Sequence, residues 1–340
     1  MKRAIPVAGL ALAAGGALLV GWIGWTALNP PPPPYHYELV ADGGVEKFPE
    51  LGLKDQAALD LKKYEVRADS ADKPVAVAHV GTRGDGAPVL LSWQNHTAEP
   101  VLRLGPAAGE LTALAAAVTS HAPPQSRVLA WWDTSRQLQL LAGSSVLFEE
   151  NMVAPLLLPP PWRAAERSIE SLEREFWRAP ASTQTEQRFA EFADAMLSEV
   201  PAGLEKLRRL AGGGEAYVVV HLTDAYRLGA LYPERFGVGF KDFPMTGQMH
   251  GTINGVKSWL KKESHSAYAV ERRDDTIVRV HFLTDKASTR TLLAQLLPFD
   301  TSNPLALDAP TVVYQHGGYW VYKLPPGGKE VETAAADPRP

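Results

Sequence analysis

Cysteine is absent from the 340 residues of this chain. Without thiols, no disulfide can stabilise the fold, although such bonds form in compartments outside the cytoplasm. Thiolates hold iron–sulfur clusters, and a Cys-x-x-Cys-His motif attaches c-type haem, so both kinds of cofactor site are excluded. Processing as a lipoprotein, which modifies a cysteine, is excluded for the same reason.

Motifs for common catalytic chemistry are missing as well. The nine histidines form neither an i, i+4 pair nor a His-Glu-x-x-His pattern that would aim two ligands at one metal. The glycines near residue 84 lack the rest of a phosphate-binding loop, and no G-x-S-x-G turn marks a serine hydrolase. We therefore predict no catalytic residue, no cofactor and no bound metal, and we interpret the chain as a non-enzyme.

A large excess of charge of one sign is also absent, since 34 Lys and Arg residues stand against 38 Asp and Glu residues. The net charge is −4, which gives no reason to expect nucleic acid as a partner. Hydrophobic residues make up 45% and charged residues 21%, values that are typical of a folded globular chain. The composition therefore predicts a protein able to bury a core.

The N-terminal segment is the most informative part that is present. Lys2 and Arg3 precede an uncharged, mostly apolar run over residues 4–28. At about 1.5 Å per residue, such a helix can cross a hydrocarbon core of roughly 30 Å. Positive charge before the run predicts a cytoplasmic terminus at residues 1–3 and a single-pass transmembrane anchor in the inner membrane at residues 4–28.

A cleaved signal peptide is the alternative interpretation of the same segment. Its apolar region would be unusually long, and Trp22 and Trp25 have the character of interfacial anchors. Five prolines at residues 30–34 then favour a stiff, extended stalk. We interpret residues 29–67 as a proline stalk and neck, which places the bulk of the chain in the periplasm.

Beyond the neck, the pattern predicts an α/β (α+β) fold in two α/β layers. Residues 68–162 alternate predicted strands and helices and form the first α/β subdomain. Residues 163–211 carry helical stripes of apolar side chains. Residues 215–324 have the order β-α-β-β-α-β of a ferredoxin-like unit with an added hairpin strand. The tail at residues 325–340 is rich in Pro, Gly and charge and is predicted to be disordered.

The sharpest local feature is the run Trp131, Trp132, Asp133 at the end of a predicted strand. One interpretation is a surface that grips a partner or ligand; the other is that the tryptophans enter the core and Asp133 initiates a turn. Aromatic side chains often anchor interfaces. Our candidate partner contact consists of these three residues together with Tyr232 and Met249, which bound a long loop in the second half of the chain.

Four blocks of sequence carry a resemblance. They are VLAWWDTSRQLQLLAG at residues 128–143, the proline-rich stretch 148–162, Phe176-Trp177, and residues 245–324 with LLAQLLPFDTSNPLAL and VVYQHGGYWVYKL. Together they resemble the hydroxylamine oxidation protein family called HaoB. The resemblance implies a single-anchor membrane protein of ammonia- and methane-oxidising bacteria that is linked with hydroxylamine oxidoreductase, a periplasmic multi-haem enzyme. It supplies no catalytic motif.

From the residues and this resemblance, we predict a membrane-anchored periplasmic accessory protein associated with hydroxylamine oxidation. Its partners would be the inner membrane and the multi-haem oxidoreductase, which it would assist or tether. Two alternatives from other classes stay open. One is an enzyme that acts on cell-envelope glycans or lipids through Trp131–Asp133, and the other is a small-ligand binding module that uses the loop 223–246.

Overall fold

The computed structural model describes most of the chain, and its sheets and helices form a mixed α/β fold, as the sequence predicts. Three sheets occur within the described part. The described residues are 4–28, 30–56, 58–97, 99–105, 108–245, 249–265, 267–273, 275–303, 307 and 309–327.

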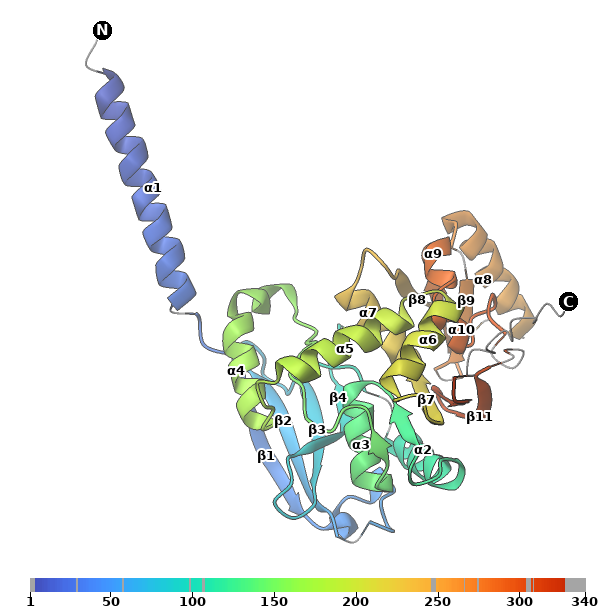
Figure 1. The fold of residues 1–340 in the computed structure, drawn as a ribbon. Helices are drawn as coiled ribbons and strands as arrows, with labels where there is room; N and C mark the ends of the chain where they lie inside the picture. The colour runs from blue at the N-terminus through green and yellow to red at the C-terminus, as the bar shows by residue number, and fades with distance from the viewer. Residues whose placement is uncertain are drawn as a thin grey trace, which may run out of the picture.

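Helix α1, Ala4–Leu28, projects away from the folded body and is joined to it by the proline run (Figure 1). Its described side chains between residues 11 and 22 are exposed. In the described part of the chain, no helix combines the length and the apolar character that a membrane crossing requires. The predicted transmembrane segment lies partly outside the described residues, because the structure does not describe the side chains of residues 4–8, 10, 23 and 26–28.

The first sheet is antiparallel and has the order β1-β2-β3-β4. Two of its strands come from the segment that the sequence analysis interprets as a neck, so that interpretation misses them. β1 lies at the sheet edge with most of its side chains at least partly exposed, so it lacks the apolar alternation that marks a strand. The strands are β1 Tyr35–Gly43, β2 Asp60–Ala68, β3 Ala76–Thr82 and β4 Val89–Asn95.

The central sheet has the order β11-β12-β7-β5-β6 and takes strands from both halves of the chain. β7 runs parallel to β5 and antiparallel to β12, so the two halves share one sheet rather than forming two separate layers. The strands are β5 Arg127–Leu129, β6 Ser145–Val146, β7 Ala216–His221, β11 Thr311–His316 and β12 Tyr319–Leu324.

The third sheet has the order β8-β10-β9, and it shows that the ferredoxin-like prediction is wrong. A ferredoxin-like unit would place all its strands in one sheet, whereas here β7 and β12 lie in the central sheet. The cause is β8, a strand inside the segment predicted as a connection, which pairs along the whole of β10. The strands are β8 Val238–Pro244, β9 Ala267–Arg272 and β10 Ile277–Leu283.

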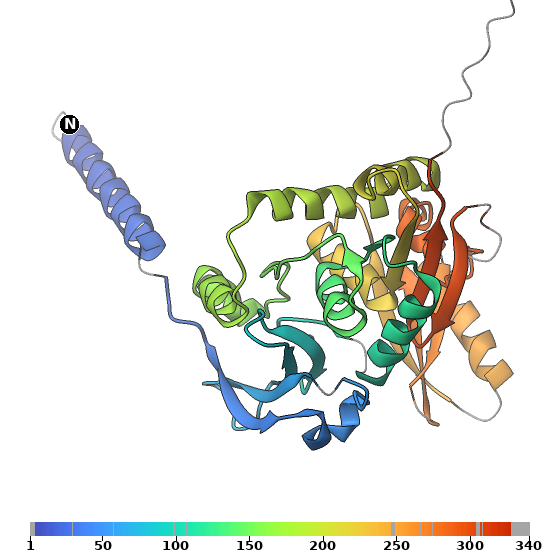
Figure 2. The same cartoon turned by 60° about the horizontal axis from the view of Figure 1, so that its bottom comes forward.

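Helices cover both faces of the central sheet. One face packs on α2 and α3, which also reach the first sheet, and the other packs on α5, α6, α7 and α10. The first sheet and the β11–β12 hairpin lie at opposite ends of the body, and α5 and α6 follow one another along one side (Figure 2). The helices are α2 Ala108–His121, α3 Trp132–Ala142, α4 Glu166–Phe176, α5 Thr183–Met196, α6 Val200–Leu210, α7 Leu222–Leu231, α8 Met249–Glu263, α9 Lys286–Thr289 and α10 Leu292–Leu296, with 3-10 turns at η1 Val45–Lys47, η2 Pro49–Leu51 and η3 Pro160–Ala165.

Helix α6 packs closely against α5 and α10 at Gly203. A Cβ added to Gly203 in α6 would lie 2.6 Å from the carbonyl oxygen of Ala195 and 2.9 Å from Cδ2 of Leu292. Backbone and core atoms cannot move aside as the end of a flexible side chain can. The glycine therefore allows α6 to approach both α5 and α10.

We expect Gly203→Ala to lower the free energy of unfolding by about 1–3 kcal/mol, because the methyl group overpacks this contact. Gly255→Ala is the matched control, since Gly255 is an exposed glycine in α8 whose added Cβ meets nothing within 4 Å. There the better helix propensity of alanine should raise stability by about 0.5–1 kcal/mol. Urea unfolding measures both changes, and a stabilising effect at residue 203 would contradict the packing argument.

Candidate functional site

The segment Trp131-Trp132-Asp133 lies where β5 passes into α3, and all three side chains are interior. Trp131 is 2% exposed, Trp132 5% and Asp133 6%. Trp131 packs edge-on against Phe189 of α5, at 5.0 Å between ring centroids. This burial favours the interpretation in which the tryptophans belong to the core.

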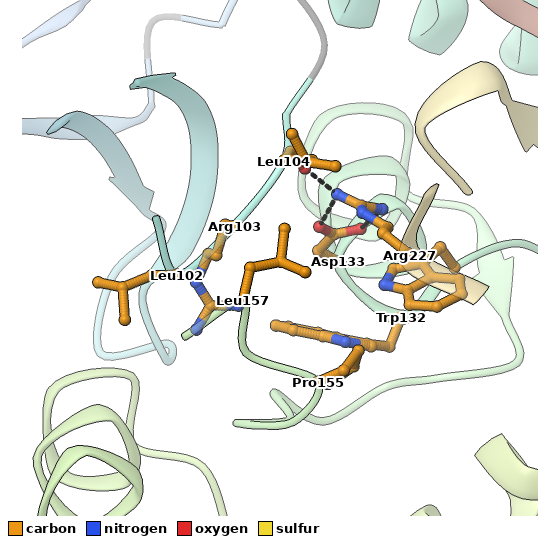
Figure 3. A pocket seen from close by; sticks show the side chains of 9 residues that line it. Leu102, Arg103, Leu104, Trp132, Asp133, Pro155, Leu157 and Arg227 are labelled. Atoms are coloured by element: carbon orange, nitrogen blue, oxygen red, sulfur yellow. Dashed lines mark hydrogen bonds and ion pairs between the residues drawn. The ribbon is translucent and has the colours of Figure 1, made fainter. Parts of the chain in front are cut away.

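Arg227 of α7 reaches this segment from the second half of the chain. Its Nη2 lies 2.7 Å from Oδ2 of Asp133 (Figure 3). Its Nη1 lies 3.2 Å from Oδ1 of Asp224, and its guanidinium covers the Trp131 ring at 5.3 Å. Burial alone would lower the pKa of Arg227, but the two carboxylates outweigh it and the pKa is raised. Burial raises the pKa of Asp224 in spite of the arginine. The group is therefore a closed ion-pair network.

A second arginine lies on the other side of the same segment. The guanidinium of Arg103 lies 5.1 Å from the ring centroids of both Trp132 and Trp177, so it is stacked between two indoles. Its Nη2 donates to Glu173 at 3.0 Å, and the two side chains are 4% and 0% exposed. A buried charge is costly unless it is paired, and each member of this pair depends on the other.

Glu173 of α4 accepts four hydrogen bonds in total. Besides Arg103, the hydroxyls of Tyr35 and Tyr37 donate at 2.6 and 2.7 Å, and Nε1 of Trp177 donates at 2.8 Å. Burial raises the pKa of both tyrosines, and the Glu173 carboxylate raises it further, so the hydroxyls keep their protons. Tyr35 is the first residue of β1, directly after the proline run. We call Glu173 and these four donors the Glu173 clamp.

A small pocket lies between the two arginines (Figure 3). Its volume is about 10 Å³, the space of one water-sized molecule. Among the described residues, Nε of Arg103 and Nε1 of Trp132 have no hydrogen-bond partner, and both side chains line the pocket. The lining residues are Leu102, Arg103, Leu104, Trp131, Trp132, Asp133, Pro155, Leu157 and Arg227.

Larger hollows open elsewhere on the surface. One of about 550 Å³ lies at the C-terminal end of α3 and includes Arg83 and Arg136, a size that suits a small ligand. Both arginines are already bonded to the chain, Arg83 to the Leu140 carbonyl at 3.1 Å and Arg136 to the Glu149 carbonyl at 2.6 Å. Burial lowers the pKa of Arg136. A hollow of about 440 Å³ lies beside Asp194 and Lys206.

Tyr226, His281 and Glu271 form a further titratable cluster. Nδ1 of His281 lies 2.5 Å from the Tyr226 hydroxyl, and its Nε2 lies 3.0 Å from the Glu271 carboxylate. The bond to His281 is the main cause that lowers the pKa of Glu271. The order phenol–imidazole–carboxylate is one that a proton relay needs. The two bonds join Tyr226 of α7 to His281 of β10 and Glu271 of β9, so the cluster fastens α7 to the third sheet. None of the three hollows described above is lined by these residues.

The remaining predicted contact residues lie apart from this site. Tyr232 ends α7 and is partly buried against the main core. Met249 begins α8, and its side chain lies outside the described residues. In the described part of the chain, no group of three or more His, Asp or Glu side chains is placed to hold a metal ion. The predicted absence of a metal stays a prediction.

Sequence reasoning missed Arg103, Glu173 and Arg227, although one signal was present. Arg103 stands in the run VLRLG, a lone charge among apolar residues. A charge in such surroundings enters the interior only with a partner. The sequence does not identify that partner, because Glu173 lies 70 residues further along the chain.

The comparisons with known proteins identify the family. The family described as HaoA-associated protein HaoB matches residues 1–324, which is nearly the whole chain. The chain therefore belongs to this family, as the resemblance in the sequence indicates. No curated protein and no solved structure matches it.

We expect Glu173→Gln to lower the free energy of unfolding by about 3–5 kcal/mol, because it leaves the Arg103 charge buried without a counter-ion. An amide nitrogen in the place of Oε2 would also face Arg103 and Trp177, whose N–H groups only donate. Glu175→Gln, an exposed position on the same helix, is the control and should change stability by less than about 0.5 kcal/mol. Thermal and urea unfolding compare the two, and equal stabilities would refute the clamp.

We expect Trp132→Ala to cost about 3–5 kcal/mol, as large-to-small changes of buried aromatic residues do. The substitution removes a packed ring and the stacking partner of Arg103. If Trp132 instead served as a partner contact, the melting temperature would change little while binding to the partner weakened. Measuring both quantities on the same variant separates the two roles.

Proposed function

We propose that this HaoB-family chain is a membrane-anchored accessory protein that holds HaoA, the hydroxylamine oxidoreductase, at the periplasmic face of the inner membrane. The observation that carries the proposal is the family match over residues 1–324, whose description names an association with HaoA. The match supports an accessory role in hydroxylamine oxidation, and the anchoring and the tethering are our inference from the chain itself.

The N-terminal helix supports the anchoring. Over its 25 residues α1 carries no Asp, Glu, Lys or Arg, and at 1.5 Å per residue it is roughly 37 Å long. A hydrocarbon core of roughly 30 Å needs about 20 such residues. Lys2 and Arg3 before the helix favour an orientation with the folded body on the periplasmic side.

The Glu173 clamp supports the tethering. A tether sets the position of a bound partner only if its end is firmly joined to the domain that binds the partner. Here the chain enters the body at Tyr35, and the hydroxyls of Tyr35 and Tyr37 are held by a carboxylate of α4 that is itself paired with Arg103. The end of the stalk is thereby fixed to two other segments of the domain.

The two alternative functions receive less support. An enzyme acting through Asp133 would need a free carboxylate beside a substrate cleft, but Asp133 is buried in an ion pair with Arg227. A ligand module using the loop 223–246 would need an open loop, but most of these residues form α7 and β8. The geometry therefore agrees best with an accessory protein whose folded body is a scaffold.

The test compares cells that make the full chain with cells that make it without residues 1–34 behind a cleavable signal peptide. We expect the full chain, and part of the HaoA pool, to stay in membranes after carbonate washing. The shortened chain should appear in the soluble periplasmic fraction and take HaoA with it. A full chain found in the soluble fraction would refute the anchor. HaoA that distributes identically in both strains would refute the tether.

A further inference from the structure

We infer that the hollow at the C-terminal end of α3 binds a small organic acid, with the carboxylate held by Arg83 and Arg136 and the apolar body on the small side chains beside them. Its volume of about 550 Å³ suits a ligand of many heavy atoms. The hollow shares no residue with the Glu173 clamp, so this site and the proposed tether can fail independently of one another.

Arg83 brings one guanidinium group to the hollow from the turn between β3 and β4. Its Nη2 donates to the side chain of Gln56 and to the carbonyl of Leu140, each at 3.1 Å. Both acceptors are uncharged, so these bonds fix the plane of the guanidinium group without neutralising it. Within the described residues, Nε and Nη1 of Arg83 make no hydrogen bond, which leaves them as donors for a ligand.

Arg136 brings the second guanidinium group from the middle of α3. Its Nε donates to the Asn151 side chain at 3.2 Å, and its Nη1 donates to the Gln139 side chain and the Glu149 carbonyl. These acceptors are also uncharged. Burial lowers the pKa of Arg136, and the attraction of Glu149 and Glu150 offsets only part of this effect. A half-buried cation of this kind is stabilised by a bound carboxylate.

The charges around the hollow favour an anion as the ligand. The interior arginines described above, Arg103 and Arg227, are each paired with a carboxylate. In contrast, no Asp or Glu is among the described residues that line this hollow. Asp85, in the same turn as Arg83, is exposed to solvent and lies outside the lining. A ligand carboxylate would therefore supply the counter-ion that the protein itself does not place there.

The C-terminal end of a helix ordinarily disfavours an anion, because its last carbonyl groups carry partial negative charge. Here two of those groups are already hydrogen-bonded. The carbonyl of Leu140 accepts from Arg83, and that of Leu141 accepts from the Gln56 side chain at 2.9 Å. The same bonds that orient Arg83 thus reduce the negative potential at the end of α3.

The remaining lining residues decide which kind of anion fits. Ala87, Val89 and Ala142 give the hollow apolar walls. Ligand sites in proteins typically combine such walls with a few polar groups that orient the ligand. The planar fork of an arginine matches the two oxygens of a carboxylate. An inorganic ion would use the arginines and leave the walls uncovered, whereas an organic acid contacts both.

The experiment titrates the full chain in detergent with benzoate and measures the heat of binding, with detergent alone as the blank. Benzamide has the same shape without the charge, and inorganic phosphate has charge without an apolar body. We expect saturable binding of benzoate at millimolar concentration. We expect benzamide and phosphate to bind about tenfold more weakly, because each lacks one of the two contacts.

Two variants test the arginines. Arg83→Gln should weaken the binding of benzoate by about tenfold or more, because hydrogen bonds between charged groups are lost. Arg83 is exposed, so the fold should tolerate this change. Arg136→Lys keeps the charge, loses the planar fork and should also weaken binding. Arg163→Gln is the matched control, since Arg163 is an exposed arginine of η3 outside the hollow. It should bind benzoate as the natural chain does.

Four results would overturn the inference. The first is that benzoate does not bind saturably to the natural chain. The second is equal binding of benzoate by the natural chain and by Arg83→Gln with an unchanged melting temperature, which would mean that the arginines do not hold the ligand. Benzamide that binds as tightly as benzoate would mean a purely apolar hollow. Phosphate that binds as tightly as benzoate would mean that the apolar walls contribute nothing.

Discussion

One buried carboxylate organises the N-terminal part of this protein. Glu173 accepts hydrogen bonds from β1, from the segment after β4 and from Trp177, so three separate stretches of chain meet at one charge. Arg103, held by that charge, stacks on the ring of Trp132, and the preceding residue, Trp131, stacks on Arg227 of α7. Through this alternation of arginines and indoles, the first sheet is coupled to the helices around the central sheet.

Local elements with a strong pattern were predictable from the sequence. The hairpin around Gly317 forms as expected, since its turn glycine adopts a φ of 58° that other residues avoid. The two consecutive strands in the predicted order β-α-β-β-α-β are present as the antiparallel pair β9 and β10. The missed strands β1, β2 and β8 carry many polar side chains, and what makes them strands is a neighbour in the sheet. Pairing of this kind is a tertiary effect that periodicity does not report.

At the candidate site, too, the local sequence pattern was predictable and the contacts between distant residues were not. The run Trp131-Trp132-Asp133 is conspicuous in the sequence, but its environment depends on side chains far along the chain. Asp133 and Arg227 are 94 residues apart, and no local pattern connects them. The sequence made this segment stand out and left open whether it faced the surface or the core, and its role as a partner contact stays a prediction. The two distant arginines, each stacked on a tryptophan of the segment, accompany its burial in the core.

The strand order of the central sheet has a consequence for how the chain reaches its folded state. β7, in the middle of this sheet, pairs on one side with β5 and on the other with β12, whose last residue is Leu324. The sheet cannot close until β12 has been synthesised, more than 100 residues after β7 begins, and contacts of such long sequence separation slow folding. A chain exported across a membrane would wait with an unpaired β7 edge, open to aggregation, until β12 arrived. Binding by a chaperone during that interval would protect this edge.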